Sequence, residues 1–346
     1  MNISDITKFL ADYDGEPLAF MEVCGTHTAA ISENAIPSLL SDRIRLISGP
    51  GCPVCVTVSG YIDRLCQLAL EPDTCVVTFG DMIRVPGSEM ALRDVTSQGG
   101  RVKMVYSPFE IIKLAKENSD TVFVFAAVGF ETTTPIYAVL MEKIIASGLK
   151  NIKLLTALKT MPPVIDALCS NGCKADGFIA PGNVSVITGA NAFKAAAEKY
   201  GKPFVVSGFS GEELLASIYA LVKLKGQGRV LNLYKNAVTD EGNEKAQRLV
   251  AKYFEPCDAG WRGMGTIKNS GMALKEEYSL YDAGSRILFA DSMKNKGCCC
   301  GEVITGARSP RECPLFSKVC TPEAPCGACM VSSEGACFHY FINNRN

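Results

Sequence analysis

Short apolar runs alternate along this chain with longer segments of helical periodicity. This alternation is typical of parallel β-sheets whose strands are joined by crossover helices, so the sequence predicts an α/β fold. Nine runs are candidate strands, at residues 18–23, 45–48, 75–79, 103–106, 122–127, 153–158, 177–180, 204–206 and 230–233. Nearly every run ends in small or polar residues. Because the carboxyl ends of strands line the ligand crevice of doubly wound sheets, these endings are the first candidates for function.

Three pairs of segments recur at nearly constant spacing. They are "PGCPVCVTVSG" (50–60) with "PGNVSVITG" (181–189), "TCVVTFGD" (74–81) with "PFVVSGFS" (203–210), and "GRVKMVY" (100–106) with "GRVLNLY" (228–234). One weak match would carry little weight, but three in the same order indicate a duplicated α/β unit. We therefore expect two tandem, related parallel-sheet domains, residues 15–145 and 146–236, that face each other across a cleft.

The two ends of the chain have different patterns. Residues 239–256 predict a helix capped by Thr239 or Asp240, and glycine-rich turns follow around Trp261 and Gly265. Residues 296–337 hold eight of the sixteen cysteines. We expect a loop-rich C-terminal domain, residues 237–346, that folds around a metal centre. A short N-terminal helix within residues 1–14, capped by Ser4, is expected to pack against it.

Composition narrows the functional class. The 346 residues are 47% hydrophobic and 21% charged, with a formal net charge of −1 and no basic stripe, so we expect no nucleic-acid partner. The longest apolar run, residues 121–130, is half a membrane span, and the start lacks a signal-peptide pattern. We expect a cytoplasmic protein with no membrane partner. Sixteen cysteines in such a compartment favour metal binding or redox chemistry over structural disulfides.

The first candidate site combines two strand endings. Cys52 and Cys55 form a CxxC pair ahead of a helical segment, where the helix dipole would favour a thiolate; the pair suits a soft metal or a dithiol–disulfide cycle. Cys24 and His27 follow another strand and would lie nearby, which suggests iron or zinc binding or nucleophilic sulfur chemistry. A stabilising zinc site or inert thiols are the alternatives. Glu131, after a very apolar strand, is either an acid–base group with a raised pKa or a stabiliser of a helix N-terminus.

The second candidate site is the cysteine-rich tail. Soft thiolates beside glycines favour an iron–sulfur cluster, with zinc as the competing occupant. From spacing alone Cys326 and Cys329 are the first choice as ligands, because CxxC is the commoner ligand pair. Cys313, followed by Pro314, resembles the Cys-Pro ending of ferredoxin motifs.

Together these motifs resemble the HypD family of hydrogenase maturation proteins, over nearly the whole chain. The resemblance rests on "CGTHT" (24–28), "SGPGCPVCVT" (48–57), "GFETT" (129–133) and "CMVSSEG" (329–335). It implies a role in building the Fe(CN)2CO unit of [NiFe]-hydrogenases, with the small chaperone HypC as partner, cyanide arriving from HypE, and HypF involved only indirectly. In this picture Cys24, Cys52 and Cys55 hold the iron, partly with thiols of HypC. His27 tunes protonation, and the threonine hydroxyls donate hydrogen bonds to the cyanide nitrogens.

The resemblance also implies a ligand set for a [4Fe–4S] cluster. The family pattern has 14, 6 and 16 residues between successive cysteines, which falls on Cys298, Cys313, Cys320 and Cys337, with the first position open among residues 298–300. Cys300 and Cys329 then remain as neighbouring thiols or a redox pair, while Cys299 and Cys326 are not readily placed. The rival classes are a stand-alone iron–sulfur thiol–disulfide reductase and a structural zinc protein.

Overall fold

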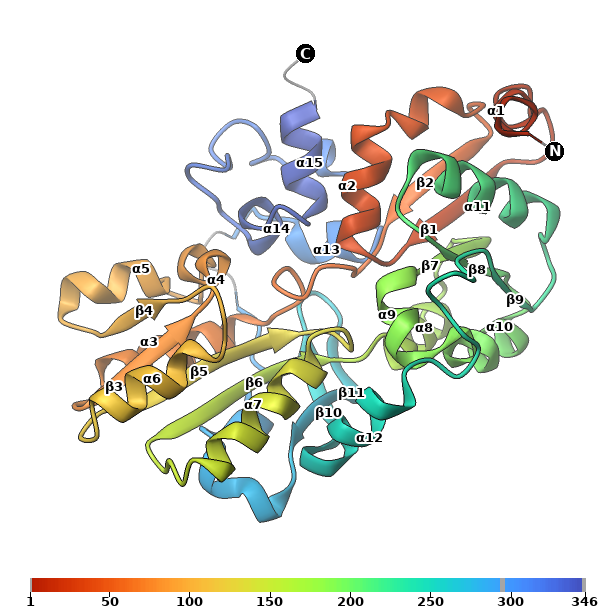
Figure 1. Cartoon of the computed structure of the whole chain (residues 1–346). Coiled ribbons are helices and arrows are strands. Elements are labelled where there is room, and N and C mark those ends of the chain that lie inside the picture. Colours follow the sequence, from red (N-terminus) through yellow and green to blue (C-terminus); the bar gives the residue numbers. More distant parts are fainter. Residues whose placement is uncertain (1, 293–295, 344–346) are drawn as a thin grey trace.

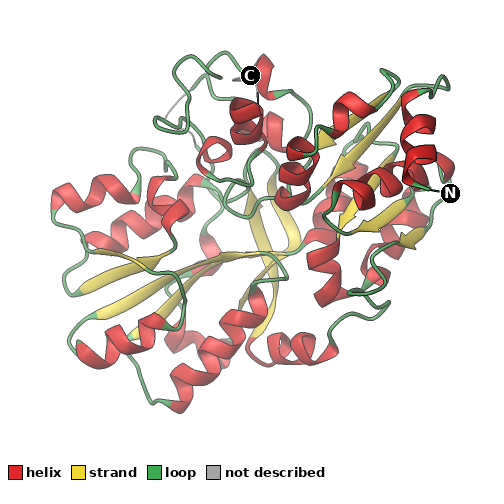
Figure 2. Ribbon diagram, turned by 45° about the horizontal axis from the view of Figure 1, so that its top comes forward, coloured by secondary structure: helices red, strands yellow, loops and turns green. Residues whose placement is uncertain are grey.

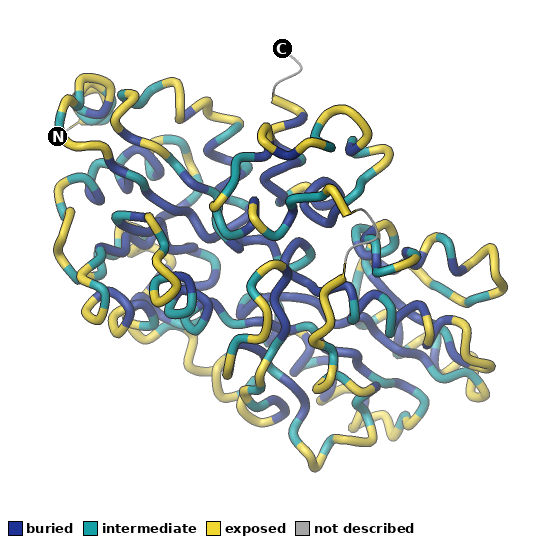
Figure 3. The backbone as a smooth tube through the Cα atoms, turned by 180° about the vertical axis from the view of Figure 1, so that it is seen from behind, coloured by how far each residue is buried: buried dark blue, intermediate teal, exposed yellow. Residues whose placement is uncertain are grey.

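The computed structural model describes residues 2–292 and 296–343 and contains two mainly parallel sheets beside a loop-rich C-terminal segment (Figure 1). The predicted α/β class is confirmed, and all nine predicted strands are present within a few residues of their expected ends. Helices lie on both faces of the strands (Figure 2). The most deeply buried parts of the chain run through the strands, and exposed residues gather on the outer loops (Figure 3).

The first sheet is entirely parallel, in the order β2-β1-β7-β8-β9. Its strands are β1 (Leu18–Glu22), β2 (Ile44–Ser48), β7 (Gly177–Pro181), β8 (Phe204–Ser207) and β9 (Val230–Asn232). The second sheet has the order β10-β11-β6-β5-β3-β4. The β10–β11 and β11–β6 pairs are antiparallel, and the other pairs are parallel. Its strands are β3 (Thr74–Thr78), β4 (Val102–Met104), β5 (Val122–Gly129), β6 (Ile152–Lys159), β10 (Phe254–Trp261) and β11 (Gly265–Leu274).

This topology corrects the prediction of two tandem domains at residues 15–145 and 146–236. β1 and β2 join strands from the second half of the chain, whereas β6 pairs with β5. The physical reason is that β1 is apolar on both faces: Phe20 packs in one core cluster and Met21 in another. Such a strand fits a central position in a parallel sheet, whichever part of the chain supplies its neighbours.

Fifteen α-helices precede, connect or follow the strands within the described residues. They are α1 (Ile3–Ala11), α2 (Gly25–Glu33), α3 (Ser59–Leu70), α4 (Gly80–Arg84), α5 (Leu92–Val95), α6 (Glu110–Glu117), α7 (Thr134–Ala146), α8 (Met161–Ser170), α9 (Gly182–Thr188), α10 (Lys194–Tyr200), α11 (Gly211–Lys223), α12 (Glu244–Tyr253), α13 (Cys300–Ile304), α14 (Ala328–Val331) and α15 (Ala336–Asn343). In the part of the chain that the structure describes, no helix has the length and apolar character needed to cross a bilayer.

The N-terminal helix differs from its prediction in two respects. Its cap is Asn2, whose side chain accepts a hydrogen bond from the backbone N–H of Asp5, and not Ser4. The helix packs on α11 and not on the C-terminal segment, with the Phe9 and Tyr219 rings 5.0 Å apart (Figure 1). Its apolar stripe therefore completes the outer face of the first sheet.

Residues 237–274 also differ from the predicted domain. α12 begins after Asn243, whose side chain accepts from the Ala246 N–H, so the cap lies later than Thr239 or Asp240. The expected glycine-rich turns are instead the β10–β11 hairpin, which pairs with β6 and extends the second sheet. The predicted C-terminal domain, residues 237–346, therefore contains a hairpin that belongs to the α/β part. The cysteine-rich segment beyond it contains α13–α15, and α15 lies beside α2 (Figure 1).

Candidate sulfur site

Two of the predicted strand endings are in direct contact. The backbone N–H of Gly25 donates to the carbonyl of Gly51 at 2.9 Å, and the N–H of Gly49 donates to the backbone carbonyl of Glu22 at 2.8 Å. A Cβ atom on Gly51 would lie 2.2 Å from the Cys24 nitrogen, so only glycine permits this approach. The structure thus places the Cys24 loop beside the Cys52 loop, as expected for adjacent parallel strands.

The Cys24 thiol is buried at the N-terminus of α2. It donates to the side-chain oxygen of Asn183, 3.7 Å away, in the first turn of α9, directly after β7. Burial raises the pKa of the Cys24 thiol to about 12, although the backbone N–H groups of His27 and Thr26 favour the thiolate. Cys24 is therefore protonated in the metal-free chain, and a soft metal ion would have to displace that proton.

Cys52 and Cys55 form a disulfide in the turn between β2 and α3, with their Cα atoms 5.2 Å apart. Both residues are buried. The prediction that they lie at a helix N-terminus is wrong, because α3 begins only at Ser59, after the extended residue Val58. The three residues Val56, Thr57 and Val58 are β-branched, which disfavours an earlier start of the helix. Dipole stabilisation of a thiolate therefore does not apply to this pair.

His27 and Thr28 have partners inside the protein. The His27 Nε2–H donates to the Gly208 carbonyl at 2.9 Å, its ring lies 4.8 Å from that of Phe209, and burial lowers its pKa to about 4. The imidazole is therefore neutral near pH 7, and its Nδ1 lacks a partner within the described residues. The Thr28 hydroxyl donates to the Glu22 carboxylate, so its proton is already engaged.

Glu131 lies two residues after the buried strand β5, close to the predicted strand end. Its Oε1 accepts the backbone N–H of Met161, the first residue of α8, at 2.7 Å, while Oε2 has no partner in the described part of the chain. Burial raises the pKa of Glu131 to about 7, and the backbone hydrogen bond opposes this rise. Both interpretations of Glu131 thus have support: it stabilises a helix N-terminus, and it can exchange a proton near neutral pH.

Seven cysteines of the tail line one small cavity. The cavity contains all four predicted cluster ligands and three further thiols: Cys298, Cys299, Cys300, Cys313, Cys320, Cys329 and Cys337. Cys326 does not line it, although its backbone N–H donates to the Cys320 sulfur at 3.3 Å. Of the CxxC pair chosen from spacing alone, Cys329 therefore lines the cavity and Cys326 does not.

The chemistry of this cavity suits a sulfur-ligated metal cluster. Soft thiolates are the usual ligands of iron–sulfur centres, and Gly327 has no room for a side chain, because its Cβ would lie 2.8 Å from the Cys298 sulfur. Hydrogen bonds from the Cys298 and Cys329 side chains lower the pKa of Cys300 well below its usual value, with help from the Arg262 guanidinium. The residues present therefore fit the [4Fe–4S] group that the resemblance implies.

The two sulfur sites share a wall. Cys329 lines the seven-cysteine cavity and also a second small cavity with Cys52 and Cys55. The Cys55 sulfur lies 4.0 Å from the carbonyl of Ala328. No three cysteine, histidine or acidic side chains are placed as ligands of a single ion in residues 2–292 and 296–343. Cys24, Cys52 and Cys55 are thus neighbours without forming a ready metal site, and the disulfide occupies two of the three sulfurs.

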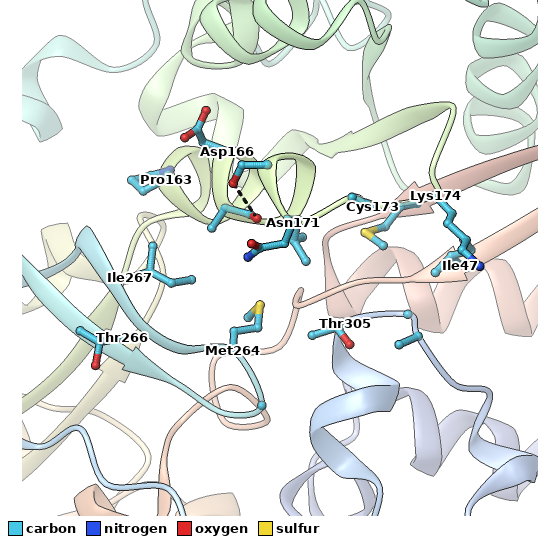
Figure 4. Close-up of a pocket in the computed structure, with 18 of the residues that line it drawn as sticks. Ile47, Pro163, Asp166, Asn171, Cys173, Lys174, Met264, Thr266, Ile267 and Thr305 are labelled. Carbon is cyan, nitrogen blue, oxygen red and sulfur yellow. Dashed lines mark hydrogen bonds between the residues drawn. The ribbon is translucent and has the colours of Figure 1, made fainter.

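A much larger cavity lies elsewhere. It has a volume of about 850 Å³ and is bounded by β2, the end of α8, the β10–β11 turn and residues 305–307. Figure 4 shows Asn171, Met264 and Thr305 around it, from three different segments. None of the predicted site residues lines this cavity. A large pocket is the usual first hypothesis for a site, but in this chain the reactive side chains are clustered in the smaller cavities.

Sequence reasoning did not single out several neighbours of these sites. They are Glu22, Asn183, Arg262 and Glu334. Asn183 carried a usable signal, since it lies in the repeat segment that matches the Cys52 loop. Glu22 ends a strand as an acid among apolar residues, which also marks it.

Comparison with known proteins decides the family. The model of the family described as "HypD: Hydrogenase formation hypA family" matches residues 2–344. The chain belongs to the HypD family. It is 40% identical over 337 residues to the hydrogenase maturation factor HypD of Azotobacter vinelandii, covering 94% of this chain and 89% of that protein. It is likewise 40% identical over 347 residues to a putative hydrogenase expression/formation protein of Methanocaldococcus jannaschii, with coverages of 99% and 96%.

The HypD family match confirms the resemblance drawn from the motifs. A third relative, the hydrogenase maturation factor HypD of Cupriavidus necator, is 38% identical over 344 residues, 96% of this chain and 91% of that protein. Because the matches run over almost the whole chain, both sulfur sites lie inside the shared region. The chain is therefore a HypD-type hydrogenase maturation factor.

Proposed function

We propose that this chain is a scaffold and redox protein for assembly of the Fe(CN)2CO unit of [NiFe]-hydrogenases, acting in the cytoplasm with HypC and receiving cyanide from HypE. The observation that carries the proposal is the pair of sulfur sites that meet at Cys329. One site offers buried thiols for an iron cargo, and the other offers the ligands of an electron-transfer cluster.

The iron fragment is the substrate in this scheme, and Cys24, Cys52 and Cys55 hold it, together with thiols of HypC. Iron that carries cyanide and carbon monoxide is electron-rich, and soft thiolates suit it. The Asn183 amide, beside the Cys24 sulfur, and the Thr26 hydroxyl are candidate donors to cyanide nitrogen. Thr28 is a weaker candidate than the motif suggested, because its proton goes to Glu22.

Protons at this site are supplied or accepted by residues whose pKa values burial has shifted. Glu131 has a pKa of about 7, and its neighbour Phe130 packs in the same apolar cluster as Cys52 and Cys55. His27 stays neutral near pH 7 and offers an unpaired Nδ1. These two residues are our candidates for accepting the protons that the thiols release when they bind iron.

Redox chemistry is required at two points. Opening the Cys52–Cys55 disulfide consumes two electrons and two protons and yields two thiols. Release of cyanide from a thiocyanate group on HypE also requires two electrons. A [4Fe–4S] cluster held by Cys298, Cys313, Cys320 and Cys337 would supply electrons one at a time when bound. Cys329 lies on the wall between the two sites, which supports a role between them.

A stand-alone iron–sulfur thiol–disulfide reductase is the second candidate function. The Cys52–Cys55 disulfide beside a cluster-type cavity favours it. The two functions differ in a simple assay, because a reductase turns over small disulfides without HypC, whereas the maturation scaffold does not.

Metal analysis of anaerobically purified chain tests the proposal. We expect about four iron atoms and four sulfides per chain, with broad visible absorption. Zinc in place of iron, in a colourless preparation, would instead indicate a structural zinc protein and would overturn the redox assignment.

A further inference from the structure

The turn between β10 and β11 lies between the two sulfur sites. Together with the strand residue that flanks it on each side, it comprises residues 261–265, Trp-Arg-Gly-Met-Gly. On one side it is hydrogen-bonded to the segment just after the disulfide. The backbone N–H of Arg262 donates to the Val56 carbonyl at 2.9 Å. The Arg262 side chain donates twice to the Thr57 carbonyl, from Nε at 3.0 Å and from Nη2 at 2.7 Å. The guanidinium is almost fully buried, with 1% of the side chain exposed.

On its other side the turn touches the helix that carries Cys300. A Cβ on Gly263 would lie 2.3 Å from the Gly301 Cα, and a Cβ on Gly301 would lie 2.7 Å from the Gly263 Cα. The two backbones are therefore in direct contact, with no space for a side chain on either. Gly301 follows Cys300 in the first turn of α13, so this contact reaches the wall of the seven-cysteine cavity.

The turn is anchored by side chains that no catalytic role explains. Asp291 accepts from the Gly263 N–H at 3.1 Å and from the Ser59 N–H at 3.2 Å, and it lies 3.6 Å from the Arg262 guanidinium. This carboxylate compensates the buried cation and ties the turn to the start of α3. Trp261 is fully buried and donates from its indole N–H to Ser270 at 2.8 Å.

We propose that the turn 261–265 is a positioning element that fixes the Cys52–Cys55 loop relative to the seven-cysteine cavity, with Arg262 as its positioning residue. The loop lies outside any helix, and Arg262 supplies the hydrogen bonds that hold the carbonyls of Val56 and Thr57. Without them a buried carbonyl loses its partner, and the loop is free to move. The benefit of this rigidity rests on the proposed function, in which the disulfide and the cavity work together.

Hydrogen exchange in the full chain, purified anaerobically, tests the proposal. In Arg262→Gln we expect the amides of residues 54–60 to exchange at least about tenfold faster, the change expected when a charge-assisted hydrogen bond is lost. Arg262→Lys keeps the charge and one donor, so it should restore part of the protection. Gly301→Ala leaves the Arg262 side chain in place but pushes the turn that carries it away from α13. It should therefore speed exchange in both residues 54–60 and 300–304.

The matched control is Gly80→Ala, where the nearest atom to the new Cβ is the Met104 sulfur at an ordinary 3.4 Å. Native exchange rates in both Arg262→Gln and Gly301→Ala would overturn the positioning role. Faster exchange spread evenly over the chain, without rescue by Arg262→Lys, would also overturn it, because that pattern indicates general destabilisation. These outcomes do not depend on iron content, so failure of the proposed function is judged separately by metal analysis.

Discussion

The contact between Gly51 and Cys24 makes Gly51→Ala a sharp test of the iron-holding site. A Cβ on Gly51 would lie 2.2, 2.4 and 2.6 Å from the nitrogen, Cα and carbonyl carbon of Cys24. All three are backbone atoms and cannot rotate away. Ordinary carbon contacts need about 3.5 Å, so the two loops have to separate by about 1 Å. The hydrogen bond from the Gly25 N–H to the Gly51 carbonyl lengthens with them.

The expected magnitudes separate function from folding. Overpacking of this kind costs ~1–3 kcal/mol, which a chain of this size tolerates. A displacement of about 1 Å between groups that must act together costs roughly 100-fold in activity. We therefore expect Gly51→Ala to remain folded, to keep the visible absorption of the tail cluster, and to lose about 99% of its maturation activity.

Complementation provides the assay for Gly51→Ala. A host that lacks its own HypD-family protein is given the variant, and hydrogenase activity is measured per amount of folded chain. Gly80→Ala is the control, because its new Cβ meets nothing closer than 3.4 Å. Equal hydrogenase activity from the two variants would show that the spacing of Cys24 and Cys52 does not matter, and would refute the reasoning.

Three further predictions concern individual side chains. Cys24→Ala should abolish maturation and leave the visible absorption intact, because it removes an iron-holding thiol outside the tail cavity. Cys313→Ser or Cys320→Ser should bleach that absorption, while Cys173→Ser should leave it unchanged. Glu131→Gln should flatten the pH dependence of stability. In the native chain the pKa of Glu131 is about 7 in the folded state and 4.5 in the unfolded state. The contribution of this carboxyl to stability is therefore fullest below pH 4.5 and falls by ~3 kcal/mol as the pH rises through 7. Urea midpoints at pH 5 and pH 8 measure this fall.

Contrary results for these variants are equally clear. Normal maturation by Cys24→Ala would remove that thiol from the iron site, and unchanged spectra would remove Cys313 and Cys320 as ligands. If Glu131→Gln lost as much stability between pH 5 and pH 8 as the native chain, the carboxyl would not titrate in that range.

The strands and their functional endings follow from the sequence, because apolar runs that end in small or polar residues have few other solutions. How those strands are shared between the sheets does not. β1 and β6 are apolar on both faces and fit the centre of either sheet, so only the packing of the whole chain decides their neighbours. The β10–β11 hairpin has no clear strand pattern in the sequence, because glycines interrupt its alternation, so the sequence predicts turns there.

The candidate sites, like the fold, follow only in part from the sequence. The motif resemblance placed Cys298, Cys313, Cys320 and Cys337 in one centre, and the structure brings all four to one cavity. Spacing alone favoured Cys326, which lies outside that cavity. Loop-rich segments have no periodicity that sets the direction of a side chain, so the position of each thiol depends on contacts formed in the fold. The contact of Arg262 with Thr57 joins residues 205 positions apart and has no sequence signature.

Infrared spectroscopy of the chain in complex with HypC tests the central claim most directly. If Cys24, Cys52 and Cys55 hold the iron fragment, the native complex shows bands of bound cyanide and carbon monoxide, and the Cys52→Ser complex lacks them. Bands that persist unchanged in Cys52→Ser would mean that other groups hold the iron, and the account of the first sulfur site would be wrong.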